Sequence, residues 1–421
     1  MKILLSACAA APAHGSEAYF GWSAFEALSR HHDVRVITSE WSKQLITNKI
    51  GKTDTARHFR FVGPPVRPIA NRMLAKMESW RLNYSFNHNV NRTARVWMGE
   101  EKFDLVHHVT YSTWRVASPL WQLPIPFFWG PIGGGEKMPL PFFGTMSLQA
   151  RMFEICRMLS DQLSCRDPRV KLCATEACAV MASNVETQKV LMRLGTAADK
   201  ISVLCPAHFS IQRIRNIQGM GRTNKSTGIL KIFSGGSLEG RKGVSLSLQA
   251  LAKAKRAGLE FRYVVGGGGP EARALRILAL KLNLSKEIQF HNGFDGHEYF
   301  EKLQESHIFL LPSLRENAGL TLIEAMLCGA LPIVAACGGP GDIVDSDVGL
   351  KVPATNPAEV IHKIAEILLR LDRDRKLLHT MGQKAKKRAE DKFSSENWLK
   401  QIELTYAKGF ARFACSVKKR R

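Results

Sequence analysis

Short apolar runs alternate with helix-like stretches along most of this 421-residue chain, and they do so in two separate series. Such runs predict strands, at residues 2–6, 33–39, 103–109, 125–129 and 201–206 in the first series and at 230–236, 261–269, 287–294, 307–313 and 331–336 in the second. Because helical patterns such as residues 17–30 lie between runs, the alternation predicts parallel sheets with crossover helices. The expected fold class is α/β, with two Rossmann-like domains.

A polar, glycine-bearing segment without clear periodicity separates the two series. We expect a first domain over residues 1–206, a linker over 207–228, a second domain over 229–395 and a C-terminal helix with a basic tail over 396–421. Ligands of such folds bind beyond the carboxyl ends of the strands, so a cleft between the two domains is the expected ligand site.

The formal net charge of +23 indicates an anionic partner, which is a nucleic acid, an acidic membrane surface or a phosphorylated substrate. No nucleic-acid-binding motif accompanies the basic residues, which are scattered apart from clusters such as the terminal SVKKRR. We therefore expect no nucleic acid partner and favour an anionic membrane face. A basic surface that is simply solvated is the alternative.

Targeting and redox signals favour a cytosolic protein, peripheral at the inner face of the membrane. The start, MKILLSACAAAPA, fits a first strand better than a signal peptide, because its apolar part before Cys8 is short. No run of about 18 apolar residues predicts a membrane span. The nine cysteines are odd in number and spread out, which favours reduced thiols over disulfides or zinc.

The segment 136–166 departs from the regular alternation and supports two interpretations. Phe153, Met152, Cys156 and Leu159 fall on roughly one helical face, which fits an amphipathic helix that touches a membrane or an acceptor lipid. A helix that faces the core of the first domain is the other interpretation, and the sequence favours it somewhat.

Two carboxylates, Glu316 and Glu324, lie eight positions apart around the start of a predicted helix. The helix is expected from about Gly319 to Cys328, after the apolar run that ends at Pro312. Glu324 shares the apolar face of this helix, where a carboxylate requires hydrogen-bond donors or a ligand with hydroxyls. Glu316 comes from the preceding loop, so both can reach one ligand. A purely structural role, at the helix dipole and on loop amides, is equally supported by these residues alone.

The surrounding sequence, E-x7-E followed by EAMLCGALPIVA and CGGPGDIV, resembles the donor-site signature of the retaining glycosyltransferases of family four, or group 1 glycosyltransferases. The resemblance is specific over residues 305–352 and extends more weakly over most of the chain. It implies the GT-B fold, whose C-terminal helix often crosses back to the first domain. It implies that Glu316 contacts the hydroxyls of the donor sugar and that Glu324 binds the nucleotide ribose. The amides that would face the diphosphate belong to Asn317, Ala318, Gly319 and Leu320.

The turn FSGGSLEGRKG follows a predicted strand and brings cations toward the same site. Lys242 matches the lysine that neutralises the leaving diphosphate in the family, and Arg241 lies beside it. The family usually has an Arg after the first glycine of this turn, where this chain has Gly236. Near the amino end, Gly15 and Ser16 resemble the glycine-rich loop whose amides approach the donor phosphate, although Ser16 is also a favoured helix cap.

The family often has D-x-x-H-x-H at the end of a strand of the first domain. Asp104 and His107 match its first part, but the second His corresponds to Val109. His108 substitutes for it only if the strand end is irregular, and on that condition we take His108 as a catalytic candidate. In WGPIGGGEKMP, Glu136 is the candidate for an acceptor contact.

The resemblance implies a retaining enzyme that moves a sugar from a nucleotide-diphosphate donor to a glycan or a lipid-linked glycan, and together with the basic charge it favours a role in cell-surface polysaccharide biosynthesis. We expect no cofactor and no metal ion, because no Asp-x-Asp precedes a plausible metal cleft. The residues expected to carry catalysis are Glu316, Lys242 and His108. A catalytically degenerate subunit of the same fold, which binds nucleotide or glycan, is the alternative.

Overall fold

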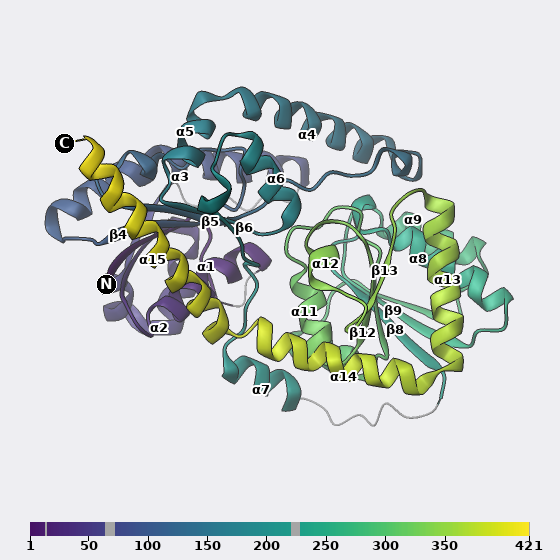
Figure 1. The fold of residues 1–421 in the computed structure, drawn as a ribbon. Helices are drawn as coiled ribbons and strands as arrows, with labels where there is room; N and C mark the ends of the chain where they lie inside the picture. The colour runs from purple at the N-terminus through teal and green to yellow at the C-terminus, as the bar shows by residue number, and fades with distance from the viewer. Residues whose placement is uncertain (13–14, 64–71, 220–227, 421) are drawn as a thin grey trace. The chain divides into compact units, whose positions relative to one another are not determined.

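Each of the two series of apolar runs forms one parallel sheet in the computed structural model (Figure 1). The structure describes residues 1–12, 15–63, 72–219 and 228–420. It contains two compact units, the first with residues 1–135, 160–210 and 395–421, the second with residues 136–159 and 211–394. The predicted α/β class with two Rossmann-like domains is confirmed.

The sheet of the first unit has seven parallel strands in the order β3-β2-β1-β4-β5-β6-β7. Its strands are β1 Lys2–Ala7, β2 Asp33–Ser39, β3 Phe59–Val62, β4 Leu105–Thr110, β5 Phe127–Ile132, β6 Ala179–Ala182 and β7 Ile201–Val203. Its helices are α1 Ser16–Leu28, α2 Lys43–His58, α3 Arg72–Glu100, α5 Pro168–Glu176, α6 Val185–Arg193 and α15 Ser395–Arg420. Residues on both faces of β4 are buried, as expected of a parallel sheet covered by helices.

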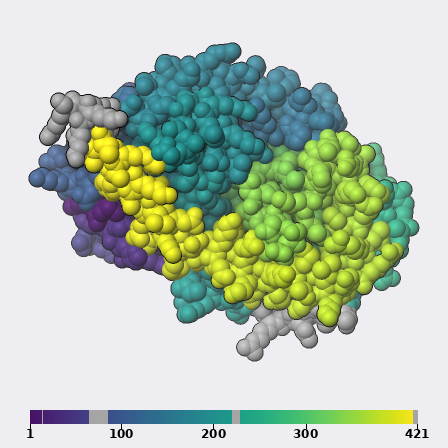
Figure 2. Space-filling model, viewed as in Figure 1, coloured from purple at the N-terminus to yellow at the C-terminus, as the bar shows by residue number. Residues whose placement is uncertain are grey.

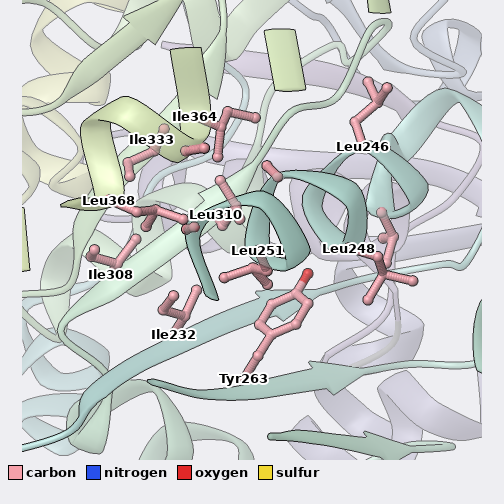
Figure 3. Close-up of a cluster of buried hydrophobic side chains, with 14 of the residues drawn as sticks. Ile232, Leu246, Leu248, Leu251, Tyr263, Ile308, Leu310, Ile333, Ile364 and Leu368 are labelled. Atoms are coloured by element: carbon pink, nitrogen blue, oxygen red, sulfur yellow. The ribbon is translucent and has the colours of Figure 1, made fainter. Parts of the chain in front are cut away.

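The sheet of the second unit has six parallel strands in the order β10-β9-β8-β11-β12-β13. Its strands are β8 Leu230–Gly235, β9 Phe261–Gly266, β10 Ile288–His291, β11 Ile308–Leu311, β12 Leu331–Ala335 and β13 Leu350–Val352. Its helices are α7 Ile211–Gly219, α8 Val244–Arg256, α9 Ala272–Lys281, α10 Gly296–Glu305, α11 Leu320–Leu327, α12 Gly338–Ile343, α13 Pro357–Arg373 and α14 Arg375–Lys392. Figure 3 shows Ile232, Leu310 and Ile333 of the strands packed against Leu251 of α8 and Leu368 of α13.

The order of strands reverses once in each sheet, between β1 and β4 in the first unit and between β8 and β11 in the second. At such a switch point the loops beyond the carboxyl ends of two adjacent strands diverge and leave room for a ligand. The loop after β1 leads to Gly15 and Ser16, and the loops after β8 and β11 carry Lys242 and Glu316. The two switch points are therefore where the fold positions candidate site residues.

The grouping of the chain into units differs from the predicted limits in two places. Residues 136–159 group with the second unit, where Met138, Phe142 and Met146 join its core. Within the predicted linker, residues 211–219 form α7, and residues 220–227 lie outside the described part of the chain. Helix α15 groups with the first unit, where Trp398 and Tyr406 are buried.

Helix α4, Leu148–Arg166, does not face a core, and the interpretation favoured by the sequence is wrong. Leu148 is 76% exposed, Leu159 is 59% exposed and Leu163 is 70% exposed. The reason is that charged side chains on the opposite side of the helix form ion pairs with the protein and turn the apolar side outward.

None of the helices, as far as residues are described, is long and apolar enough to cross a membrane. All nine cysteines fall in the described part of the chain, and no disulfide bond joins any two of them.

Candidate active site

The glycine-rich turn after β8 and the loop after β11 lie side by side because a glycine permits close approach. Gly243 has a φ of +68°, and a Cβ there would lie 2.2 Å from the carbonyl oxygen of Pro312. The amide of Leu314 donates to the carbonyl of Arg241 at 2.8 Å. This contact holds the basic turn against the loop that carries Glu316.

The carboxylate of Glu316 lies between two cations of that turn. The ammonium group of Lys242 forms an ion pair with Glu316 Oε2, and a guanidinium nitrogen of Arg241 lies 3.3 Å from the same oxygen. Burial raises the pKa of the Glu316 carboxyl, but the charges of Lys242 and Arg241 outweigh burial and hold that pKa below its ordinary value. Glu316 is therefore an ionised acceptor, with two cations beside it.

Glu324 is buried on α11 and is held by two residues that the sequence analysis did not identify. Tyr299 of α10 donates its hydroxyl to Oε2 at 3.1 Å, and Arg213 of α7 lies 3.4 Å from Oε1. Burial raises the pKa of Glu324, and the two partners only partly offset it. Burial and the Glu324 charge also raise the pKa of Tyr299.

The backbone between the two carboxylates leads into the start of α11. Gly319 precedes the helix with a φ of +66°, and no side chain caps the first turn. The glycine pair after β12 supports this backbone, because the amide of Gly339 donates to the carbonyl of Glu316 at 2.9 Å. A Cβ at Gly338 would lie 2.2 Å from the same carbonyl. Amides at the start of a helix attract anions, so the segment 317–320 is suited to phosphate.

The departure from the family pattern at Gly236 has a structural counterpart. Gly236 has a φ of +127°, which a residue with a side chain rarely adopts, and a Cβ there would point toward Lys242 Nζ at 3.7 Å. Gly267 belongs to the glycine run that follows β9, and a Cβ there would lie 2.0 Å from the carbonyl oxygen of Gly236, so this run and the turn after β8 are in close contact. Arg241 supplies a second cation near Glu316 from elsewhere in the turn.

In the first unit, the predicted loop residues begin α1. Gly15 occupies the N-cap position with a φ of +61°, and Ser16 is the first helical residue, so Ser16 does not act as the cap. The neighbouring Glu17 accepts a hydrogen bond at 2.8 Å from the amide of Ser112, which follows β4. Burial raises the pKa of Glu17, and the bonds from Ser112 partly offset it. Sequence reasoning did not identify this link across the switch point of the first sheet.

The two histidines of β4 are both buried. His107 contacts the Tyr406 hydroxyl and the Gly130 carbonyl at 2.6 Å each, and His108 Nδ1 lies 3.1 Å from the hydroxyl of Ser6. Burial lowers the pKa of each histidine to about 4. The pairing of β4 with β1 shifts register directly after His108, so the strand end is irregular, which was the condition placed on its catalytic role. That role stays a prediction.

Glu136 belongs to the second unit, where it is buried 4.0 Å from Arg157 of α4. Its Cγ would lie 3.1 Å from a Cβ at Gly338, close to the backbone of Glu316. A second buried pair joins Glu154 of α4 to Arg315 at 2.7 Å. The structure thus places Glu136 near the Glu316 loop, and its predicted acceptor contact stays a prediction.

Most of the predicted donor residues come together in the second unit: Arg241, Lys242, Glu316, Asn317, Ala318, Gly319, Leu320 and Glu324. Gly15, Ser16 and His108 lie in the first unit. Over the described residues, no group of three His, Cys, Asp or Glu side chains is arranged to hold a metal ion.

A model of the family described as glycosyl transferases group 1 matches residues 220–388. This segment contains Lys242, Glu316 and Glu324. Residues 220–388 belong to the group 1 glycosyltransferases. The predicted family is therefore confirmed.

Relatives of known name agree with this family. The chain is 28% identical over 174 residues to the putative colanic acid biosynthesis glycosyltransferase WcaL of Escherichia coli, covering 40% of this chain and 42% of that one. It is 28% identical over 220 residues to the D-inositol 3-phosphate glycosyltransferase of Streptomyces bingchenggensis, covering 49% of this chain and 47% of that one. The chain thus spans less than half the length of these relatives.

The fold matches solved glycosyltransferase structures over nearly its whole length. The crystal structure of Anabaena HepE in complex with UDP and glucose superposes with a TM-score of 0.63 at 16% identity, covering 97% of this chain and 99% of that one. The group 1 glycosyltransferase domain of this chain therefore occurs within the predicted GT-B fold.

Proposed function

We propose that this protein is a retaining glycosyltransferase that moves a sugar from a nucleotide-diphosphate donor to a glycan or lipid-linked glycan. The observation that carries the proposal is the convergence of Lys242 and Arg241 on the partly buried carboxylate of Glu316. It occurs at the switch point of the second sheet, inside the segment that matches the group 1 family. Perturbed titratable groups at such a position are typical of functional sites.

The donor roles follow from the chemistry of each group. Lys242 and Arg241 neutralise the diphosphate together with the amides of residues 317–320, without a metal ion in this proposal. Glu316, held ionised, accepts hydrogen bonds from sugar hydroxyls when Lys242 turns to the phosphate. Glu324 accepts hydrogen bonds from the ribose hydroxyls in place of, or beside, Tyr299 and Arg213.

The proposed reaction keeps the anomeric configuration. The bond between the anomeric carbon and the donor phosphate oxygen breaks, and a bond from that carbon to an acceptor oxygen forms on the same face. The acceptor hydroxyl gives its proton to the departing phosphate, whose negative charge Lys242 stabilises. Removing one such stabilising donor from an enzyme costs about 100-fold to 1,000-fold in turnover.

The acceptor is proposed to be a growing cell-surface polysaccharide, bound by the first unit in the cytosol. The support is the similarity to WcaL, which is named for colanic acid biosynthesis. His108 and Glu136 stay candidates for contacts near the transferred sugar and the acceptor.

A second candidate is a degenerate subunit of the same fold that binds nucleotide or glycan without transfer. Gly236 at the place of the usual family arginine and the burial of His108 favour it. Donor binding without turnover under any acceptor condition would support this candidate over the enzyme.

The proposal is tested by a thermal-shift panel with UDP, GDP, ADP and their sugar conjugates on wild type, Glu324→Ala and Glu366→Ala. Glu366 lies on α13 with its side chain half exposed, so it is the matched control. A ligand at 100 times its dissociation constant adds about 2.7 kcal/mol of stability. We expect one base to shift wild type and the control but not Glu324→Ala. The absence of a shift with every nucleotide contradicts a donor site.

A further inference from the structure

Helix α4 is one continuous helix (Figure 1), and exposed apolar residues recur along it from Leu148 to Leu163. Five residues at helical spacing form an apolar stripe, and their side chains are 76%, 58%, 43%, 59% and 70% exposed in turn: Leu148, Met152, Ile155, Leu159 and Leu163. Leu148 to Leu163 spans about 22 Å of helix at 1.5 Å per residue. Atoms of this blue-green part of the chain form part of the surface in Figure 2. We call these five residues the α4 stripe.

Three charged residues of α4, Glu154, Arg157 and Asp161, lie on the opposite side and form ion pairs with the protein. Within the second unit, Glu154 pairs with Arg315 at 2.7 Å and Arg157 lies 4.0 Å from Glu136. Within the first unit, Asp161 pairs with Arg115 at 2.5 Å. The rotation of the helix about its axis is therefore fixed by partly buried ion pairs. This is the reverse of an ordinary surface helix, whose apolar residues face inward.

A stripe held outward in this way requires an apolar partner, and we propose that it inserts into the interfacial region of an anionic lipid bilayer. Exposed contiguous apolar surface of this kind marks a membrane or protein interaction site. This proposal does not depend on the transfer reaction, because it rests on residues outside the donor site.

Charge distinguishes a bilayer from a second copy of the chain. No exposed residue of α4 is acidic, and the exposed Arg166 lies in line with the stripe at its C-terminal end. Arg169 and Lys171 follow and are also exposed. Two copies that each carry a net charge of +23 repel one another, whereas an anionic surface attracts the same charge. Apolar insertion and basic attraction are the two contributions that bind interfacial helices.

The test is sedimentation of the full chain with phosphatidylcholine vesicles that contain or lack 30% phosphatidylglycerol. The variants are Leu148→Gln/Leu159→Gln in the stripe and Leu280→Gln on α9, whose side chain is also exposed, at 62%. We expect wild type and the control to bind anionic vesicles with similar affinity. The affinity of the stripe variant should be lower by about 10-fold or more. Thermal melts verify that all three proteins fold.

A fluorescence measurement follows insertion directly. Leu159→Trp keeps an apolar residue in the stripe, and we expect its emission to shift to the blue with anionic vesicles, while Leu280→Trp shows no shift. Equal vesicle binding of the stripe variant and wild type would overturn the proposal in favour of binding by charge alone. Sedimentation velocity that shows a wild-type dimer absent from the stripe variant would overturn it in favour of a second copy.

Discussion

Two glutamates eight positions apart have opposite electrostatic environments in this protein. Burial acts on both, but two adjacent cations lower the pKa of Glu316, while burial prevails at Glu324 and raises its pKa. Pairs of acids whose environments separate their pKa values often have separate roles in catalysis. Here the ionised Glu316 lies beside the basic turn, and Glu324 lies deeper, against Tyr299 and Arg213.

Replacing Glu324 with Gln is expected to change how stability depends on pH. The folded state raises the pKa of Glu324 above its unfolded value of about 4.5, so its stabilising contribution is present below that value and is lost as pH rises through the folded pKa. The free energy of unfolding of Glu324→Gln, relative to wild type, should therefore increase between pH 4.5 and pH 8. Urea denaturation at four pH values measures it. If the difference in the free energy of unfolding between Glu324→Gln and wild type stays constant or declines with pH, the pKa of Glu324 is not raised by folding.

At the scale of elements, the sequence predicted the strands that surround both switch points and the loops that follow them. It did not predict β3, β6 or β13, which are three or four residues long and too short to show a period. The equally short β7, β10 and β11 were predicted from longer runs, at residues 201–206, 287–294 and 307–313. Glu316 and Lys242 were identified because each lies in a continuous segment of sequence that resembles a motif of the family. Arg213 was not, because it lies 111 positions from Glu324 and only tertiary packing joins them. The outward face of α4 was the less favoured of two interpretations, because the ion partners that fix its rotation are distant in sequence.

The packing of α15 on the first sheet predicts that replacing Gly409 of this helix with alanine destabilises the protein. A Cβ at Gly409 would lie 2.3 Å from a ring carbon of the buried Phe128. Gly409→Ala should therefore lower the free energy of unfolding by about 1–3 kcal/mol, the usual range for overpacking. Gly99→Ala, near the end of α3, meets no atom within 4 Å and should instead raise it by about 0.4–1 kcal/mol. Urea denaturation measures the change in the free energy of unfolding for both variants. Changes of the same sign would contradict the close packing of Gly409 on Phe128.

The ion pair between Glu154 and Arg315, which orients α4, should have a larger coupling free energy than an exposed pair of similar geometry. Glu154→Gln leaves the buried Arg315 guanidinium with a neutral partner, which should lower the free energy of unfolding by about 1–3 kcal/mol. Lys363 and Glu366 are 3.1 Å apart and half exposed, so solvent screens their attraction and their coupling should be smaller than that of Glu154 and Arg315. Double-mutant cycles with Arg315→Met and Lys363→Met measure both couplings. Equal couplings would show that burial does not strengthen the α4 pair.

At the scale of the whole molecule, donor binding and membrane binding are proposed for separate parts of the protein. We propose that the loops at the switch point of the second sheet bind the donor and that the α4 stripe binds a membrane. Donor binding should therefore be independent of vesicles, and vesicle binding should be independent of nucleotide. Co-sedimentation with and without saturating nucleotide checks this separation, and a large change in either affinity would show that the two are coupled.

The central claim is that Lys242 binds the second phosphate of a nucleotide donor beside Glu316. Calorimetric titration of wild type, Lys242→Met and the exposed control Lys253→Met tests it most directly. The ligands are the diphosphate and the monophosphate of whichever base the thermal-shift panel identifies. Loss of a hydrogen bond to a charged group, about 1.5–3 kcal/mol, should weaken diphosphate binding about 10-fold to 150-fold. Monophosphate binding and the control should stay near wild type. Unchanged diphosphate binding in Lys242→Met, or an equal loss for both nucleotides, would contradict the account.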